Sequence, residues 1–461
     1  MHSHIEIIGQ ERRPQMTPID SSNTAPLKVL WFTNILMPDA CEHLGRAPQA
    51  GSGWWMVGLL NRLKKRTDLR IAVVSVAGFR DGHFHSDGVE YFTLRQPLRR
   101  ALLRRLRSSA AAAPSVAEIE RYASIVRNWD PDIIHVHGTE RDCGLIKAWG
   151  LTEKPVIISI QGLMGAYQRK AFGDLLPHEV RGSWLQRLTG VNSDTLLRWK
   201  LSRQHAPLEE QIIRSADLIL GRTEWDYAWA WAIRPNLKYR RVDEIMRPEF
   251  LTADAWRLEN CRRHQIFCTT GNTALKGLHV LLEAVLRLRS TYPNIAVTVA
   301  SSGFETPPSN GYVRFIHNMI HREELQAAVT FLGWTDEEGL TKQLQRAHCY
   351  VMPSFVENSS NALQEAMLVG VPVVATACGG TPTIVDVGRT GLTFPPGDAA
   401  VLALRLHRMF QDDDLAVRLG AQARIIARER QDPERVEAQL MSAYREAMTA
   451  VFTSEVTHAH F

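Results

Sequence analysis

The sequence predicts an α/β protein made of two doubly wound, Rossmann-like domains that face each other across a cleft. Short apolar runs alternate with amphipathic segments through most of the 461 residues, and this alternation is typical of parallel strands joined by crossover helices. The pattern breaks near residues 247–259 and then starts again. At roughly 100–200 residues per domain, the length also favours two or three domains.

The first set contains five predicted strands and four predicted helices. The strands are expected at 28–32, 71–76, 133–136, 156–160 and 218–220. The helices are expected at 54–65, 117–129, 207–215 and 224–232. Residues 171–200 have no clear periodicity, and they are compatible with either a mobile loop or two short helices.

The second set repeats this order. Its strands are expected at 266–269, 295–300, 329–332, 350–352 and 371–375. Helices are expected at 278–289, where apolar positions recur at helical spacing, and at 433–450, beyond the second set. The resulting division is a flexible polar arm at 1–26, a first domain at 27–255, a second domain at 256–430, and a C-terminal helix and tail at 431–461.

The composition is that of an ordinary globular protein, and we expect no nucleic-acid partner. The formal net charge of +5 favours anionic ligands only weakly. The six cysteines form no Cys-x-x-Cys pair, which favours reduced thiols in a cytosolic protein. The chain opens without a secretion signal, and no run of about 18 apolar residues occurs. These features predict a cytoplasmic location.

A strongly basic stretch runs from Arg95 to Arg107 and contains six arginines and no acid. On a helix, its four leucines share one arc and most of the arginines lie outside it. One interpretation is a membrane-surface helix that approaches anionic lipid at the inner face of the membrane. The other is a solvated basic helix that packs on its leucines. Both interpretations remain open at this point.

The most informative stretch is 351–372, which reads VMPSFVENSSNALQEAMLVGVP. A strand of the buried type ends at Pro353, a polar loop carries Glu357, and a predicted helix at 362–369 carries Glu365. Ligands of open α/β sheets bind at the C-terminal ends of the strands. The free N–H groups at a helix N-terminus suit a diphosphate. The stretch therefore predicts a site for a phosphorylated ligand.

Each part of this stretch also has a structural explanation. Acids are common near helix starts because they suit the helix dipole, so Glu365 alone would not indicate a ligand, and Glu357 alone would be an ordinary loop acid. Asn361 and Gln364 resemble a capping box, which predicts the helix start there. The complete pattern carries the functional interpretation: seven residues separate the two glutamates, and E-A-M-x-x-G-x-P-V-V follows.

With these motifs the sequence resembles the family-four retaining glycosyltransferases, which share the two-domain GT-B fold. Their E-x7-E hallmark corresponds to Glu357 and Glu365, and the typical E-A-M-x-x-G-x-P-V-V-A-T continues over 365–376. A Gly-Gly element matches 378–382, and G-x-x-G-L-x-x-P-P-G-D ends at 391–398. The resemblance is strongest over the second domain and weaker, though visible, over the first.

The resemblance implies that the first domain binds the acceptor and the second binds the nucleotide sugar. It places Glu357 near the donor sugar and Glu365 on the ribose hydroxyls. Backbone N–H groups of the helix start would meet the sugar and diphosphate; these are Ser359, Ser360, Asn361 and Ala362. It further implies a UDP- or GDP-sugar donor, a glycan or glycolipid acceptor in polysaccharide biosynthesis, and neither a cofactor nor an essential metal.

Lys276 precedes the helix at 278–289 and is a point charge suited to a phosphate. In the resembled family an arginine lies about five residues before this lysine, and both neutralise the leaving diphosphate. This chain has no arginine over 269–275. Asn272 or Thr273 would offer weaker neutral hydrogen bonds there, or another arginine would fill the space.

Further site candidates lie at the ends of predicted strands. A glycine loop after the first strand allows backbone N–H groups to approach a phosphate or sugar; its residues are Gly51, Ser52 and Gly53. His135 and His137 project from the same side of a strand; His137 is the expected sugar contact, whereas His135 is expected in the core. Trp334 follows the strand at 329–332 and is expected beside the nucleobase.

The reaction implied is attack by an acceptor hydroxyl on the same face from which the diphosphate leaves, with that diphosphate accepting the proton. Glu357, His137 and Lys276 are the expected catalytic residues. Two alternatives remain: a sugar-nucleotide epimerase or hydrolase on the same fold, or a non-catalytic donor-binding subunit. A nicotinamide oxidoreductase is disfavoured because no G-x-G-x-x-G follows the first strand.

Overall fold

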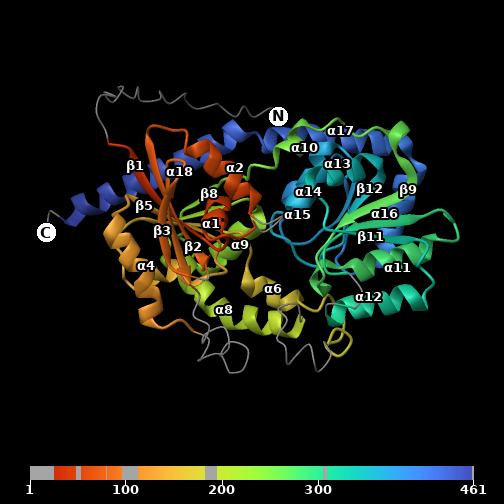
Figure 1. Ribbon diagram of the computed structural model, residues 1–461. Coiled ribbons are helices and arrows are strands. Elements are labelled where there is room, and N and C mark those ends of the chain that lie inside the picture. The colour runs from red at the N-terminus through yellow and green to blue at the C-terminus, as the bar shows by residue number, and fades with distance from the viewer. Residues whose placement is uncertain are drawn as a thin grey trace, which may run out of the picture.

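Two parallel-sheet halves stand side by side in the computed structural model, each sheet covered by its own helices (Figure 1). The model describes residues 25–47, 53–78, 80–95, 113–181, 195–304, 308 and 310–458. The predicted doubly wound architecture is confirmed. In its described part, the chain has no helix both long and apolar enough to cross a membrane.

The first sheet has the strand order β3-β4-β2-β1-β5-β6-β7-β8. Its strands are β1 (Leu27–Thr33), β2 (Leu69–Gly78), β3 (Gly82–Ser86), β4 (Val89–Arg95), β5 (Ile133–His137), β6 (Val156–Ser159), β7 (Leu218–Gly221) and β8 (Tyr239–Arg241). Its helices are α1 (Pro38–His43), α2 (Trp54–Leu63), α4 (Val116–Trp129), α5 (Leu145–Ala148), α6 (Met164–Lys170), α8 (Thr195–Ser215) and α9 (Glu224–Ile233). All neighbouring strands run parallel except the β3–β4 hairpin.

The second sheet has the order β11-β10-β9-β12-β13-β14 and is parallel throughout. Its strands are β9 (Arg262–Thr269), β10 (Ala296–Ala300), β11 (Val329–Gly333), β12 (Ala347–Met352), β13 (Val373–Thr376) and β14 (Leu392–Phe394). The helices are α10 (Pro248–Thr252), α11 (Leu278–Leu288), α12 (Gly311–Arg322), α13 (Glu337–Arg346), α14 (Asn361–Val369), α15 (Thr381–Ile384), α16 (Ala399–Gln411) and α17 (Asp413–Arg430).

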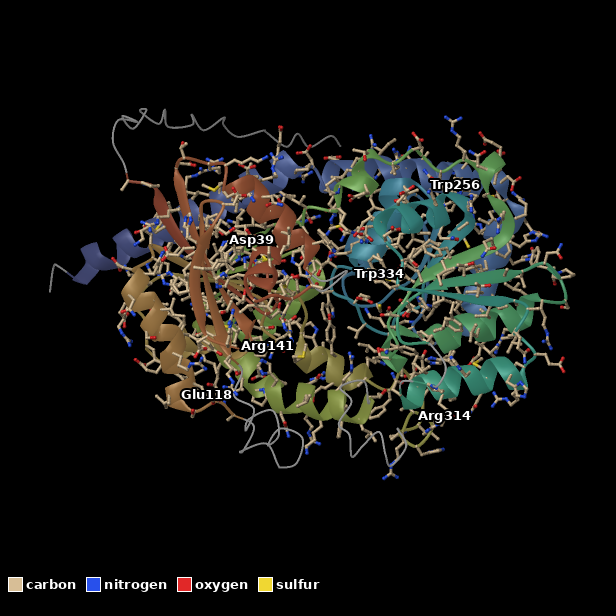
Figure 2. All side chains as sticks on the ribbon, viewed as in Figure 1. Asp39, Glu118, Arg141, Trp256, Arg314 and Trp334 are labelled. Carbon is tan, nitrogen blue, oxygen red and sulfur yellow. The ribbon has the colours of Figure 1, made fainter. Side chains whose placement is uncertain are left out.

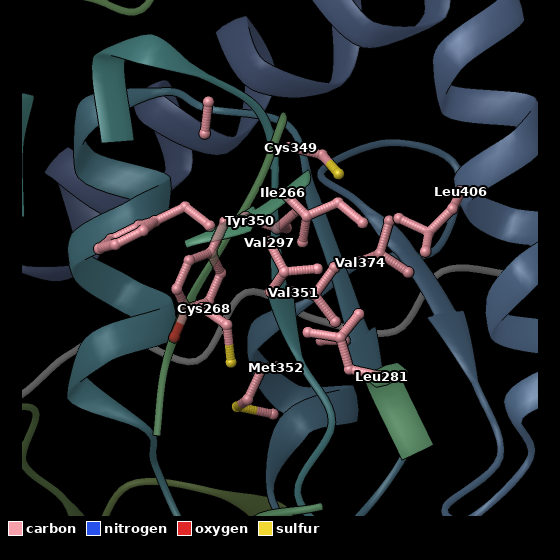
Figure 3. Packing of buried hydrophobic residues seen from close by; sticks show 14 of the residues in the cluster. Ile266, Cys268, Leu281, Val297, Cys349, Tyr350, Val351, Met352, Val374 and Leu406 are labelled. Atoms are coloured by element: carbon pink, nitrogen blue, oxygen red, sulfur yellow. The ribbon is translucent and has the colours of Figure 1, made fainter. Parts of the chain in front are cut away.

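Strand β12 lies in the middle of the second core, and all six of its residues are buried. Figure 3 shows its residues Tyr350, Val351 and Met352 among side chains of neighbouring strands and of α11 and α16. A central parallel strand is covered on both faces, so its sequence is a continuous apolar run. This burial fixes the end of β12, from which the loop carrying Glu357 starts.

Helix α8 departs from the prediction. A helix was expected to begin at Pro207, but α8 begins at Thr195 and contains Pro207 in its interior. A proline in a helix normally removes one backbone hydrogen bond and crowds the preceding turn. Packing of α8 against α5, α6 and α9 outweighs that cost. The extended helix brings the residues before Pro207 to the space between the two halves.

The last helix, α18 (Pro433–His458), returns from the second half to pack on the first sheet (Figure 1). The hydroxyl oxygen of Tyr444 accepts a 2.9 Å hydrogen bond from Nε1 of Trp31 and lies 2.8 Å from Nδ1 of His135. Nε2 of His135 lies 2.7 Å from Oγ of Ser159. Both ring nitrogens of His135 are therefore satisfied inside the core, as predicted.

We expect Tyr444→Phe to lower the free energy of unfolding by about 1–3 kcal/mol, because it leaves the indole N–H of Trp31 buried without its acceptor. Urea denaturation followed by tryptophan fluorescence measures the change. Tyr227→Phe is the matched control, since Tyr227 is 42% exposed and surface changes usually stay within about 0.5 kcal/mol. Equal effects of the two changes would show that the Tyr444 hydroxyl does not fasten α18.

Candidate active site

The loop between β12 and α14 ends at Ser360, which is the N-cap of α14 and accepts a hydrogen bond from the backbone N–H of Leu363 at 3.4 Å. The prediction of Asn361 as the cap is therefore wrong by one residue. Gln364 does not complete a capping box, because its amide nitrogen donates to Oγ of Ser359 and its oxygen accepts from Gln431. The helix start nevertheless lies where the motif predicted it.

Glu357 lies in this loop with its side chain only 12% exposed. Its Oε1 atom is 2.5 Å from Nζ of Lys276 and accepts a 2.8 Å hydrogen bond from Oγ of Ser354. Lys276 ends a short 3₁₀ turn, Ala274–Lys276, directly before α11. Two of the three predicted catalytic side chains are thus in direct contact, although 81 residues separate them.

Gly277 explains how the lysine reaches the loop. Its φ of 69° lies in the left-handed region, and a Cβ there would stand 2.0 Å from the carbonyl oxygen of Pro353. Only glycine allows this backbone approach. The backbone N–H of Phe355 also donates to the carbonyl of Leu275 at 2.8 Å. The turn before α11 and the end of β12 therefore form one rigid support.

Glu365, on the first turns of α14, is held by Arg247. Nε and Nη2 of Arg247 donate to the two carboxylate oxygens, each at 2.8 Å, and Nη1 donates to Glu337 at 2.9 Å. The guanidinium also lies 4.7 Å from the ring centre of Phe250. Burial raises the pKa of Glu365, and the charge of Arg247 opposes that rise. The sequence analysis missed Arg247, which lies 118 residues from its partner.

Removing one member of this buried pair leaves the other charge without compensation. We expect Arg247→Met to cost about 3–5 kcal/mol of stability, and the double change Arg247→Met with Glu365→Gln to recover part of it. Thermal and urea denaturation measure both. Arg257→Met serves as the control, because the Arg257–Glu259 pair is 68% exposed on both sides. A double variant that is less stable than Arg247→Met would contradict the pairing.

His137 ends β5 and is buried, with its ring centre 4.4 Å from that of Trp31 and 3.9 Å from that of His135. Burial lowers its pKa to about 3, so the imidazole is neutral near pH 7. Its Nε2 atom has no hydrogen-bond partner among the described residues. Arg222 and Glu244, a buried ion pair, line the same cavity of about 30 Å³ as His137.

The E-x7-E loop is fastened to the first half of the molecule. Oγ1 of Thr223, the N-cap of α9, donates to Oδ1 of Asn358 at 2.8 Å. Nδ2 of Asn358 donates to the carbonyls of Ile160 and Gln161 at 3.4 and 3.3 Å, past the end of β6. The motif therefore lies where the C-terminal ends of strands from both sheets meet, which is the crevice expected to bind ligand.

Comparison with known proteins agrees with this geometry. Residues 262–425 match the model of the family described as glycosyl transferases group 1. This segment is a group 1 glycosyltransferase domain. A glycogen synthase of Mycobacterium tuberculosis is 25% identical over 302 residues, which are 65% of this chain and 64% of that protein. A D-inositol 3-phosphate glycosyltransferase of Corynebacterium urealyticum is 32% identical over 181 residues, 38% of this chain and 41% of that protein.

The chain aligns with less than two thirds of the length of these curated relatives. Solved structures extend the likeness in fold over both halves. Sucrose-phosphate synthase from Thermosynechococcus elongatus has a TM-score of 0.65 at 18% identity, covering 92% of this chain and all of that one. Anabaena HepE in complex with UDP-glucose has a TM-score of 0.61 at 17% identity, covering 91% and 100%. The chain thus has the GT-B fold, as the resemblance implied.

The other residues predicted to bind the donor lie in the glycine loop before α2 and in two loops of the second half. Gly53 is the N-cap of α2, where a Cβ would clash with Ile35, whereas Gly51 and Ser52 lie outside the described residues. Trp334 is 59% exposed, and Figure 2 shows it on the edge of the group 1 glycosyltransferase domain nearest the other half. The Asn272 carbonyl accepts from Nδ2 of Asn310 at 3.0 Å.

The cavity that Lys276 lines also has an arginine in its wall, although the stretch just before Lys276 has none. Arg198 of α8 lines the same cavity of about 460 Å³ as Lys276. It comes from the stretch without periodicity, 171–200, so no local signal pointed to it. Glu140, in the loop after β5, lines this cavity as well. Thus the first half supplies one cation and one acid beside the group 1 glycosyltransferase domain.

Proposed function

We propose that the chain is a retaining glycosyltransferase that moves a sugar from a UDP- or GDP-sugar to a hydroxyl of a glycan or glycolipid. The observation that carries this is the 2.5 Å pair of Lys276 and Glu357 at the N-terminal end of α14, in the crevice between the sheets. A cation and an acid in contact suit a donor whose diphosphate joins its sugar at that point.

In this proposal the two parts of the donor meet different groups. Glu357 and the neutral His137 hold the sugar, and Glu365 accepts hydrogen bonds from the ribose hydroxyls while Arg247 keeps its carboxylate oriented. Lys276 and the helix N-terminus receive the diphosphate. The backbone groups assigned to it are those of Ser359, Ser360, Asn361 and Ala362. The glycine loop of Gly51, Ser52 and Gly53 completes the phosphate site, and Trp334 and Asn272 lie toward the nucleoside.

The proposed reaction breaks the bond between C1 of the sugar and the diphosphate oxygen. The acceptor oxygen forms its bond to C1 from the same face, and its proton passes to the departing diphosphate. Lys276 stabilises the negative charge that develops on the leaving group. Because the pKa of His137 is depressed to about 3, this residue orients the sugar as a neutral hydrogen-bonding group and carries no charge.

The membrane contact remains a prediction. Of the basic stretch from Arg95 to Arg107, residues 96–107 lie outside the described part of the chain. We propose that this stretch holds the enzyme at the inner, anionic face of a membrane, where a lipid-linked acceptor is presented. Co-sedimentation with anionic and neutral vesicles tests it, and equal binding to both would count against a basic anchor.

The decisive experiment separates three functions. UDP- and GDP-sugars are first screened for an upward shift of the melting temperature, starting with UDP-glucose because HepE was solved with it. Turnover is then measured with and without acceptor. Acceptor-dependent release of nucleotide with an unchanged anomeric configuration supports the proposal. Acceptor-independent turnover indicates an epimerase or hydrolase, and a shift without any turnover indicates a non-catalytic subunit.

A further inference from the structure

A cavity of about 460 Å³ opens between the first half of the molecule and the turn that carries Lys276. Helices α6 and α8 form one wall, and residues 273–276 with Val356, which precedes Glu357, form the other. Large apolar and aromatic side chains dominate the lining: Met164, Tyr167, Trp199, Leu208, Leu275 and Val356. The cavity therefore reaches the proposed reacting atoms and offers them a mainly apolar neighbourhood.

Part of the polar lining is already occupied by protein contacts. Nε2 of His205 lies 2.7 Å from the carbonyl oxygen of Thr139, and the hydroxyl of Ser202 contacts the sulfur of Met164 at 3.6 Å. A chain of sugars needs hydrogen-bond partners along its whole length, since unpaired polar groups are costly to bury. These walls suit a ligand that is apolar over most of its surface.

Glu140 supplies a polar group at the inner wall. Its Oε2 atom is buried and has no hydrogen-bond partner among the described residues. Burial raises the pKa of Glu140 to about 7; nearby Glu209 adds to the rise, while backbone N–H groups and Arg222 oppose it. Glu140 shares this cavity with Lys276 and with Val356, the residue before Glu357.

We infer that this cavity binds an amphiphilic acceptor, with a hydroxyl-bearing head toward Glu357 and Lys276 and an alkyl or aryl body between α6 and α8. Glu140 accepts a hydrogen bond from a head-group hydroxyl that neighbours the reacting one. The inference rests on the proposed function and specifies its acceptor. The reacting hydroxyl still loses its proton to the departing diphosphate, so Glu140 is an acceptor-binding residue and transfers no proton.

The first test compares acceptors that share one head group. With the donor that supports turnover, kcat/KM is measured for methyl, butyl, hexyl and octyl glucosides and for maltotriose. We expect about a threefold to fourfold gain per buried methylene until the cavity is filled, and poor use of maltotriose. Equal values along the alkyl series, or preference for maltotriose, would overturn the inference.

The second test changes the walls. Leu208→Ala and Trp199→Ala should flatten the dependence on alkyl length, whereas Leu404→Ala, at a leucine 58% exposed on α16, should not. Glu140→Gln keeps the side-chain size and should raise KM for octyl glucoside about tenfold, a loss typical of one intramolecular-strength hydrogen bond. Glu338→Gln, at a side chain 75% exposed, is its control.

These outcomes separate the two proposals. A protein that no nucleotide sugar stabilises, and that uses none of the acceptors, contradicts the proposed function itself. A protein that uses the donor with no preference for alkyl acceptors retains the proposed function but contradicts the amphiphilic acceptor. The thermal shift produced by UDP or GDP, whichever stabilises the parent, checks that the Glu140, Trp199 and Leu208 variants remain folded. An unaltered KM in folded Glu140→Gln contradicts the role of Glu140.

Discussion

Glu357→Gln is expected to lower kcat/KM for the donor by about 10²–10³-fold, the loss typical when one preorganised polar contact to a transition state is removed. The carboxylate contacts Lys276 at 2.5 Å and accepts a hydrogen bond from Ser354. An amide of the same size cannot balance the lysine charge, so both the sugar contact and the position of the ammonium group are disturbed. Initial rates at varied donor concentration measure the effect.

Glu338→Gln controls for loss of a glutamate that pairs with a lysine, because Glu338 contacts Lys342 in an exposed pair on α13. Such exposed pairs contribute little to stability. The Glu357 variant should still unfold cooperatively and at nearly the temperature of the parent. Activity within threefold of the parent in a folded Glu357→Gln protein would remove Glu357 from the reaction and with it the main support for the proposed function.

Local patterns were sufficient for the framework of both halves. Buried parallel strands such as β12 are continuous apolar runs, and the loop that follows β12 contains polar residues and then a helix that stops at Gly370 in the left-handed region. The residues at which such strands and helices begin and end are determined by residues nearby in the sequence, within one or two turns. The end of β12, the start of α14 and the core position of His135 could therefore be predicted.

The partners of the site could not be predicted in this way. Arg247 lies 118 residues from Glu365, and Thr223 lies 135 residues from Asn358. Only the folded chain brings such pairs together, and no short-range periodicity records them. Arg198 and Glu140 were missed for the same reason, since they reach the cavity beside Lys276 through the packing of α8 and the end of β5.

Lys276 has two roles, one in the structure and one in the proposed reaction, and substitutions can separate them. In the structure Lys276 neutralises Glu357, and in the proposed reaction it also meets the diphosphate. We expect Lys276→Met to lower kcat by about 10²–10³-fold and to weaken binding of UDP or GDP, whichever stabilises the parent, because the leaving group loses a cation. Lys276→Arg should recover part of the rate, while the exposed Lys342→Met should have little effect.

A double variant tests whether Lys276 and Glu357 act as a unit. If the transition state requires the ion pair as a whole, the double variant Lys276→Met with Glu357→Gln should be no slower than the slower single variant. The effects of substituting residues that act together are not additive. If the fold-losses in rate of the two single variants multiply in the double variant, each side chain instead contacts a separate part of the donor. Full activity of Lys276→Met would indicate that other cations stabilise the charge of the diphosphate. Arg198, which lines the same cavity, would then be the first residue to substitute.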